Sequence, residues 1–406
     1  MTSTERHEAR YQRRRTARAA QKEKRCAKYD NFDWVFSYEH LYHSYKMCRR
    51  GVGWKASVQK YITNAPLLVY GTWERLKNGK YKSSGFYEFD VFERGKQRHI
   101  KSVTIGERVV QRCLCDYALV PMLERTFIYD NGASLKNKGY SFTVNRLCHH
   151  LRKFYRKHGR NGYVLIFDFS KFFDRVSHKI VKRMLRNEFS DEKLLQLTEH
   201  FIDAFGPVGM GLGSQISQVL ALASANPLDH AIKELMRIKN NVRYMDDGWM
   251  IHESKEYLKH CMKVIEQICK SLDIVLNTKK TQIVKLSHGF TFLKIRFSIT
   301  ETGKVIRKIY KRSVTKQRQK LKKLAVKLKQ GVVTMKDIQN SMQSWVAYAG
   351  NFNAKHTVQK MWALYNELFT TGGNCKCFTK QRWVKRSLTR WRSWPAASMC
   401  RAAGAC

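Results

Sequence analysis

Three things are scarce in this chain of 406 residues: acidic side chains, long apolar runs, and cysteine pairs at metal-binding spacing. It has 32 Asp and Glu against 77 Lys and Arg, which leaves a formal net charge of +45. Such an excess of one sign predicts a polyanionic partner, with nucleic acid first and an anionic membrane surface second. There is no 18-residue apolar run and no lipidation motif, so we expect no membrane partner. The opening residues, MTSTERHEARYQRRR, contain no apolar signal segment, so we expect a cytoplasmic protein.

The cysteines favour reduced thiols over a disulfide framework. There are 11 of them, an odd number, and none forms a CxxC pair. A zinc site in the basic tail is the alternative, formed from Cys375, Cys377, Cys400 and Cys406.

Apolar periodicity separates a central body from two basic ends. Residues 1–26 are polar and basic, and we expect them to form a frayed helix or a disordered arm. In the body, the run YVLIF at 163–167 predicts a buried strand, and the segment 253–272 predicts an amphipathic helix. Strand signals return in QIVKL and FTFLKIRF. We therefore predict an α+β fold with a small sheet.

The composition changes after Glu301, because no acidic residue lies in 302–336. The segment VTKQRQKLKKLAVKLKQ predicts a helix whose other faces are basic and whose apolar stripe consists of Val314, Leu321, Leu324 and Leu328. An all-basic helix face suits a phosphate backbone. Two more helices are predicted, in MKDIQNSMQSWVAYAG and HTVQKMWALYNELF. The tail at 371–406 interleaves aromatic and basic residues, and we expect it either to bind nucleic acid or to be disordered.

The stretch VRYMDDGWMI, residues 242–251, carries the most chemical information. Asp246 and Asp247 are adjacent like charges between apolar flanks, and burial disfavours both. Asp247-Gly248 between two β-type runs is a hairpin signal, so we predict the two carboxylates at a hairpin tip. Divalent cations stabilise such a pair, and Mg²⁺ prefers hard oxygen ligands. A two-metal site needs a further carboxylate, which Asp168 is placed to supply at the end of the YVLIF strand.

These residues resemble the catalytic motifs of reverse transcriptases. The tetrapeptide YMDD, which begins at Tyr244, is similar to their YxDD box, and FDFSKFFDRVSH is similar to their first catalytic motif. The resemblance implies a right-hand polymerase fold with Asp168, Asp246 and Asp247 as catalytic residues. It also implies two Mg²⁺ ions, for which Mn²⁺ can substitute, held by Asp168, Phe169, Asp246 and Asp247. Tyr244 would pack against the primer end.

Other motifs resemble the nucleotide-binding parts of this family. They are ERGKQRHIKSVTIGERVVQRCL, which resembles the fingers, and the motifs GLGSQISQVLALASANPLD and LNTKKTQI. The second motif resembles a Gly-rich loop that leads into a helix, and we expect that helix to begin at Ser217 and Gln218. The implied nucleotide-binding residues are Arg98, Lys96, Lys101, Phe173, Gly213, Ser214, Gln218 and Lys280. Phe173 falls where the family closes against a ribose 2′-hydroxyl, which implies a preference for deoxynucleotides; a core aromatic is the alternative. FTFLKI resembles the primer grip, with Phe292 and Leu293.

The resemblance spans about 35–370 and implies a division into domains. These are a basic arm (1–33), fingers with part of the palm (34–162), a palm whose antiparallel sheet carries the YxDD hairpin (163–300), a helical thumb (301–370) and a basic aromatic tail (371–406). The implied partners are an RNA template, a DNA or RNA primer and dNTPs.

The motif forms also indicate a kind of reverse transcriptase. LGSQISQ fits the [ILV]GxxxSQ form of diversity-generating retroelements, a bacterial and phage group in the group II intron-like lineage. This implies a structured noncoding RNA and a helical accessory protein as partners. Leu212 departs from the usual Pro-x-Gly of this loop. The alternatives are a defence-associated bacterial reverse transcriptase acting with a noncoding RNA, and a non-catalytic RNA-binding or splicing-helper protein. YMDD and Phe173 disfavour an RNA-dependent RNA polymerase.

Overall fold

The computed structural model describes residues 2–93 and 96–369, and the side chains of Glu93 and Lys96 lie outside that description. The zinc alternative and the nucleic-acid prediction for the C-terminal tail concern residues outside this range. Within it, no helix is both long enough and apolar enough to cross a membrane.

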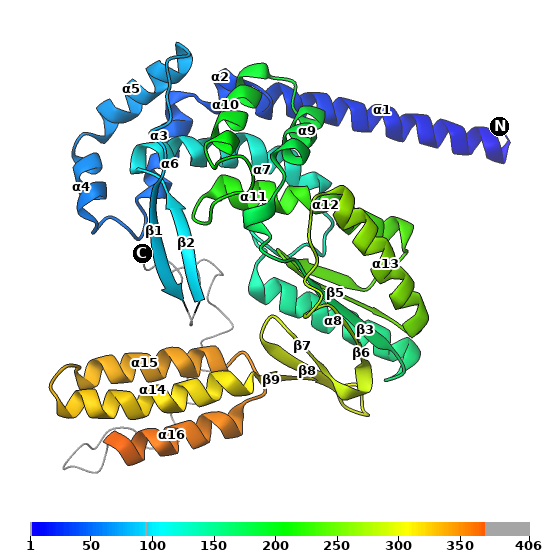
Figure 1. The fold of residues 1–406 in the computed structure, drawn as a ribbon. Helices are drawn as coiled ribbons and strands as arrows, with labels where there is room; N and C mark the ends of the chain where they lie inside the picture. Colours follow the sequence, from blue (N-terminus) through cyan, green and yellow to red (C-terminus); the bar gives the residue numbers. More distant parts are fainter. Residues whose placement is uncertain (1, 94–95, 370–406) are drawn as a thin grey trace. The chain divides into compact units, whose positions relative to one another are not determined.

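Helices and antiparallel strands make up the described chain (Figure 1). The helices before the first strand are α1 (Ser3–Tyr29), α2 (Phe32–Val35), α3 (Tyr38–Cys48), α4 (Ala56–Thr63) and α5 (Ala65–Lys77). The next elements are β1 (Tyr87–Glu93), β2 (Lys96–Ser102), α6 (Ile105–Leu114), α7 (Val120–Leu123), α8 (Tyr140–His158), β3 (Tyr163–Asp168), α9 (His178–Glu188), α10 (Glu192–Asp203), α11 (Gln215–Ser224) and α12 (Asn226–His230). The remaining elements are β4 (Asn241–Tyr244), β5 (Asp247–His252), α13 (Lys255–Ser271), β6 (Gln282–Lys285), β7 (Phe290–Phe292), β8 (Ile295–Ile299), β9 (Val305–Ile309), α14 (Lys311–Lys329), α15 (Met335–Ala349) and α16 (Lys355–Phe369).

Residue contacts divide the chain into two compact units. Among the described residues, the first comprises 2–93, 96–147, 167–250 and 259–282, and the second comprises 148–166, 251–258 and 283–369. The interior of the first unit includes the fully buried side chains of Leu114, Leu119, Met122, Phe201 and Trp249.

Local sequence signals explain where several helices begin. The side-chain oxygens of Ser37, Thr104, Asp191 and Thr334 each accept a hydrogen bond from the backbone N–H three residues further on. Such caps satisfy a donor that the first helical turn leaves unpaired, and each contributes about 1 kcal/mol. Ser214 precedes α11 without a cap of this kind, because its hydroxyl donates to Gln111 instead.

The strands form small sheets with antiparallel hairpins. β1 and β2 pair from Tyr87 opposite Ser102 to Glu93 opposite Lys96, and β7, β8 and β9 form a three-stranded antiparallel sheet. β4 pairs antiparallel with β5, in a four-stranded sheet of order β4-β5-β3-β6. The structure therefore agrees with the expected α+β class. It also contains the predicted strand at 163–167 and the helix predicted over 253–272, and the N-terminal arm is a helix.

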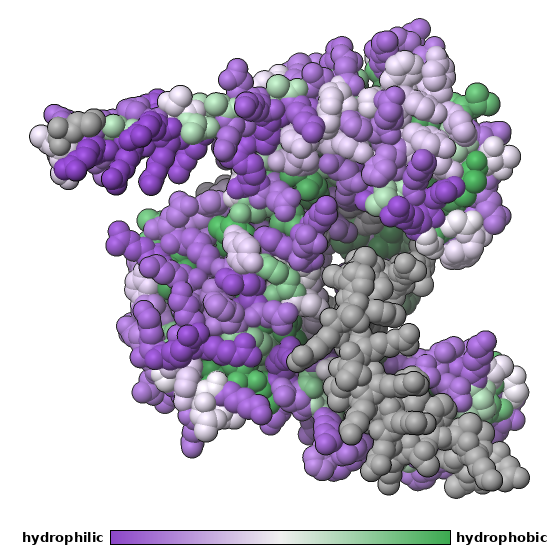
Figure 2. Space-filling model, turned by 180° about the vertical axis from the view of Figure 1, so that it is seen from behind, coloured by the Kyte–Doolittle hydropathy of each residue, from purple (hydrophilic) through white to green (hydrophobic). Residues whose placement is uncertain are grey.

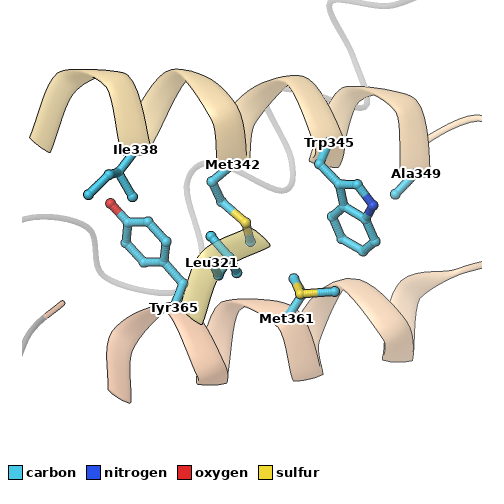
Figure 3. Close-up of a cluster of buried hydrophobic side chains, with 7 residues drawn as sticks. All are labelled: Leu321, Ile338, Met342, Trp345, Ala349, Met361 and Tyr365. Carbon is cyan, nitrogen blue, oxygen red and sulfur yellow. The ribbon is translucent and has the colours of Figure 1, made fainter. Parts of the chain in front are cut away.

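The three helices of the second unit, α14, α15 and α16, pack around one apolar cluster (Figure 3). Its buried members are Leu321, Ile338, Met342, Trp345, Ala349, Met361 and Tyr365. Side chains of α15 point toward those of α16, and Leu321 of α14 lies between them. The predicted stripe on α14 is confirmed, because Val314, Leu324 and Leu328 pack against this cluster. Burial of such side chains stabilises the helices by roughly 1.5–3 kcal/mol each.

Replacing Met342 by Ala should destabilise this helical cluster by about 2–5 kcal/mol, because the cavity adds to the lost apolar contacts. Amide hydrogen exchange of peptides from 311–369, followed by mass spectrometry, should then be faster than in the parent protein. Val326→Ala is the matched control, since Val326 lies on α14 with 56% of its surface exposed. Its effect should stay within about 0.5 kcal/mol. Unchanged exchange in Met342→Ala would contradict the packing described.

Candidate active site

The hairpin β4–β5 carries the paired carboxylates. Tyr244 lies opposite Asp247, so Met245 and Asp246 are the two turn residues. The predicted hairpin is present. Its turn was predicted at Asp247-Gly248, but both of these residues belong to β5, and the turn lies at Met245 and Asp246. Gly248 meets a different requirement: a Cβ there would lie 2.0 Å from Cζ of Phe167. The aromatic ring at the end of β3 therefore approaches the hairpin where glycine leaves room.

A buried ion pair next to the β4–β5 turn holds the turn in place. Arg243 is 1% exposed and Asp229 is fully buried, and the guanidinium donates to both carboxylate oxygens at 2.7 Å. A third donor, Nη1 of Arg243, bonds the carbonyl oxygen of Met245 at 2.9 Å. Met245 has a left-handed backbone, with φ of 54°, which costs a non-glycine residue roughly 1–2 kcal/mol. The bond from Arg243 offsets part of that cost and holds the turn in this conformation.

The end of β3 is tied directly to the hairpin turn. The backbone N–H of Phe169 donates to the carbonyl of Asp246 at 3.1 Å. Asp168, the residue before it, is 3% exposed. Carboxylates some 80 positions apart in sequence thus belong to neighbouring backbone segments, as the strand-end position of Asp168 predicted.

Asp168 is held by a segment that follows α13. Its Oδ1 accepts from the amide of Asn277 at 3.1 Å, and its Oδ2 accepts from Nζ of Lys280 at 2.6 Å. The backbone N–H of Asn277 also donates to the Asp168 carbonyl at 2.7 Å. Lys280 therefore lies against Asp168, in the segment where the LNTKKTQI motif predicted a lysine.

The pKa shifts of Asp246 and Lys280 reflect the charges around them. The pKa of Asp246 is raised, first because burial disfavours the charged carboxylate and also because Asp168 is near; Lys280 and Arg98 oppose this rise. Partial burial lowers the pKa of Lys280, but its bond to Asp168 and the charges of the three aspartates raise it overall. Lys280 and Arg98 are thus the cations close to this acidic group.

The Gly-rich loop packs against strand β2. The carbonyl of Leu212 accepts from the backbone N–H of Lys101 at 3.1 Å. Gly213 has φ of 115°, and a Cβ there would lie 3.1 Å from the Lys101 carbonyl oxygen. The glycine is therefore needed for close approach to β2.

Several predicted residues have other partners in this structure. Nζ of Lys101 donates to the Phe205 carbonyl at 3.0 Å and lies 3.3 Å from the Glu88 carboxylate. Ser214 is 4% exposed. α11 begins at Gln215, so Ser217 and Gln218 lie within its first turns and do not start it, contrary to the prediction.

Of the other predicted residues, Phe173 and Gln218 lie in the first unit, and Phe292 and Leu293 lie in the second. Phe173 is half-buried beside the ring of Phe172, and the Phe173 carbonyl accepts from the backbone N–H of Met210 in the Gly-rich loop at 2.6 Å. Gln218 is exposed and accepts from the hydroxyl of Ser134. Phe292 and Leu293 belong to the second unit, where Phe292 is buried and Leu293 begins the turn between β7 and β8.

The donor chemistry of the site suits a hard divalent cation. Across residues 2–93 and 96–369, no three His, Cys, Asp or Glu side chains form a cluster that could hold a metal ion, and Lys280 neutralises Asp168. The available donors are nevertheless carboxylate oxygens, which Mg²⁺ prefers. The pKa of Asp246 is raised first by burial and then by the charge of Asp168, so a charged carboxylate at this position is disfavoured unless a cation compensates it.

The sequence reasoning did not identify Arg243 and Asp229. One signal was available: an arginine inside the apolar strand run of β4 must find a buried partner, because an unpaired internal charge is strongly destabilising. Nothing in the local pattern identifies that partner as Asp229, which lies 14 residues earlier.

Residues 82–297 match the family model described as "Reverse transcriptase (RNA-dependent DNA polymerase)". The match covers more than half of the chain, which therefore belongs to the reverse transcriptase family.

Two known proteins are similar to this chain. Protein YkfC of Escherichia coli (strain K12) is 25% identical over 251 residues, which are 49% of this chain and 62% of YkfC. A solved structure of telomerase from Candida albicans, in complex with a fragment of telomeric RNA, is similar with a TM-score of 0.45 and 10% identity. That likeness covers 73% of this chain and 62% of the telomerase chain. The chain thus spans less than two thirds of the length of both proteins.

Replacing Arg243 by Ala should lower the free energy of unfolding by about 3–5 kcal/mol, because Asp229 would remain as a buried, uncompensated charge. The measurement is denaturant unfolding followed by circular dichroism. Arg186→Ala is the matched control: this arginine pairs with Glu199 but is 54% exposed, so its loss should cost at most about 1 kcal/mol. Equal effects of the two substitutions would contradict the role given to the buried pair.

Proposed function

We propose that this chain is an RNA-directed DNA polymerase that synthesises cDNA on an RNA template by two-metal nucleotidyl transfer. The observation that carries the proposal is the hydrogen bond from Phe169 to the carbonyl of Asp246, which brings the segment of Asp168 next to the YMDD turn. Family membership supports the same conclusion, since it rests on the segment 82–297 that contains both motifs.

In this proposal Asp168, Asp246, Asp247 and the Phe169 carbonyl hold the divalent cations, with Mg²⁺ first and Mn²⁺ as a substitute. Cations bound there stabilise the attacking and leaving oxygens of a phosphoryl transfer. The protein's own contribution is to hold the acidic groups together against their repulsion. Asp168 and Asp246 would bind the cations directly, whereas Asp247 would support the site and act through water.

The cationic side chains would bind the triphosphate. Arg98 and Lys280 are fixed positive charges close to Asp246, and such charges are suited to phosphate oxygens. The ammonium group of Lys280 bonds Oδ2 of Asp168, and a cation held at that oxygen would leave this ammonium group available for the phosphates. Lys96 and Lys101 are proposed as helpers. Gly213, Ser214 and Gln218 belong to the loop and helix that would hold the base pair.

We further assign β1–β2 to the fingers, the YMDD hairpin to the palm, and α14–α16 to the thumb. Tyr244 would contact the primer end, with Phe292 and Leu293 as the primer grip. The biological setting proposed first is a bacterial or phage diversity-generating retroelement, supported by the LGSQISQ motif, with a structured RNA and a helical accessory protein as partners. A defence-associated reverse transcriptase in the cytoplasm is the alternative setting.

Asp246→Asn should abolish primer extension on an RNA template with dNTPs. Loss of several kcal/mol of charge stabilisation corresponds to a fall in rate of about a thousandfold or more. Glu266→Gln on α13 is the matched control, since it removes one exposed carboxylate outside the site and should leave extension unchanged. Full activity of Asp246→Asn would refute the proposal, and RNA binding without extension by the parent protein would favour a non-catalytic RNA-binding role.

Phe173→Ala should increase the use of ribonucleotides relative to deoxynucleotides. The ring is half-buried beside Phe172, so its removal opens space while Phe172, 5% exposed, retains the local packing. The readout is the ratio of kcat/KM for an rNTP and the matching dNTP, with an expected shift of about tenfold or more, or 1.4 kcal/mol. Phe172→Ala is the control for packing, and it should reduce stability without changing the ratio. An unchanged ratio in Phe173→Ala would show that this residue is a core aromatic.

A further inference from the structure

Helix α1 has an exposed surface whose charges are segregated by face. It runs for 27 residues with no buried side chain, and it is hydrophilic along its length (Figure 2). It contains ten Lys and Arg and three Glu. At about 100° per residue, all ten basic positions fall within an arc of about 200°, and the three glutamates fall in the remaining arc. We call the first of these arcs the basic face of α1.

This arrangement is unfavourable for a helix that is only solvated. Such helices gain from opposite charges three or four residues apart and lose when like charges occupy those positions. In α1 no Lys or Arg lies three or four positions from Glu5, Glu8 or Glu23. Arginines instead follow one another at this spacing, as at Arg10, Arg14 and Arg18. Like-charge pairs of this kind destabilise the helix, and a polyanion on the basic face would relieve their repulsion.

The composition of α1 identifies the kind of polyanion. Between Ser3 and Lys28 there is no Leu, Ile, Val, Met, Phe or Trp, so the helix, although it contacts α2 and α7 of this chain, lacks an apolar face that could enter a lipid surface or form a hydrophobic interface with a partner protein. Single-stranded nucleic acid is bound by stacking on several aromatic rings, and this segment offers only Tyr11. Phosphates alone are the remaining chemistry. Their regular rows in a double helix match a rigid helix of about 40 Å.

We propose that the basic face of α1 is a docking surface for the phosphate backbone of double-helical RNA. The inference goes beyond the polymerase reaction, because α1 contributes no residue to the candidate active site. A paired region of the RNA that the enzyme copies, or of an RNA bound with it, would contact α1 without readout of its sequence, as expected for A-form helices.

The test compares two full-length variants with equal loss of charge. The first replaces Arg10, Arg13, Arg14 and Arg18 on the basic face by Gln. The control replaces Lys179, Arg183, Lys263 and Lys270 by Gln, which are exposed cations on α9 and α13. Both are made in an Asp246→Asn background, so that binding is measured without polymerisation. The probe is an RNA duplex of about 20 base pairs, titrated by fluorescence anisotropy at several salt concentrations, with a single strand of equal length alongside.

The salt dependence of duplex binding should become shallower by about three in the slope of log Kobs against log salt for the α1 variant, since each lost phosphate contact removes about 0.7–0.9. The control should keep the parent slope, and circular dichroism should show the helix content unchanged in both. A slope change below about one in the α1 variant, an equal change in the control, or a loss confined to the single strand would overturn the proposal. Lost binding to anionic vesicles with duplex binding intact would overturn it in favour of a membrane surface. Primer extension by the same α1 variant with Asp246 restored tests the polymerase proposal separately.

Discussion

The candidate site depends on one buried charge pair. Arg243 and Asp229 leave water together, and two further N–H groups of the guanidinium donate to the carbonyls of Met245 and Leu222. A pair of this kind is a weak source of stability, because desolvation offsets much of the Coulomb attraction. What it does provide is geometry: the fork of donors fixes a turn whose backbone would otherwise avoid the left-handed region. The backbone carbonyl of Asp246 in this turn then accepts from the N–H of Phe169, just after β3.

The rest of the first unit brings positive charge and phosphate-binding potential to that turn. Lys280, in the segment after α13, bonds Asp168, and the charges of Lys280 and of Arg98 on β2 oppose the rise in the pKa of Asp246. Strand β2 also contacts the Gly-rich loop, because the backbone N–H of Lys101 donates to the carbonyl of Leu212. Two acidic residues on neighbouring backbone segments, with cations from separate elements near them, form an arrangement whose donor chemistry suits both a metal ion and an anionic substrate. The large positive charge of the whole chain favours a nucleic-acid partner, because it attracts a polyanion.

Much of this could be predicted from the sequence, where local pattern alone determines the outcome. The strand ending at Asp168, the helix over 253–272 and the apolar stripe of α14 follow from periodicity. The hairpin was predicted correctly but its turn was misplaced, since Asp-Gly is the usual turn signal and the packing of Phe167 on Gly248 is invisible in sequence. Ser214 was expected to face substrate, yet its hydroxyl bonds Gln111, a partner 103 residues away. The Arg243–Asp229 pair was not predicted for the same reason, because the partner of a buried side chain is determined by tertiary contacts and not by the local sequence pattern.

In the proposed active site, Asp168 and Asp246, from distant parts of the sequence, would share one cation. Replacing Mg²⁺ by Fe²⁺ and adding ascorbate and peroxide would cut the backbone close to the bound ion, and mass spectrometry would locate the cuts. Cuts should cluster in two segments, around Asp168 and around Asp246, should be suppressed by excess Mg²⁺, and should disappear in Asp168→Asn. Cuts near only one of these segments, or an unchanged pattern in Asp168→Asn, would contradict the shared site.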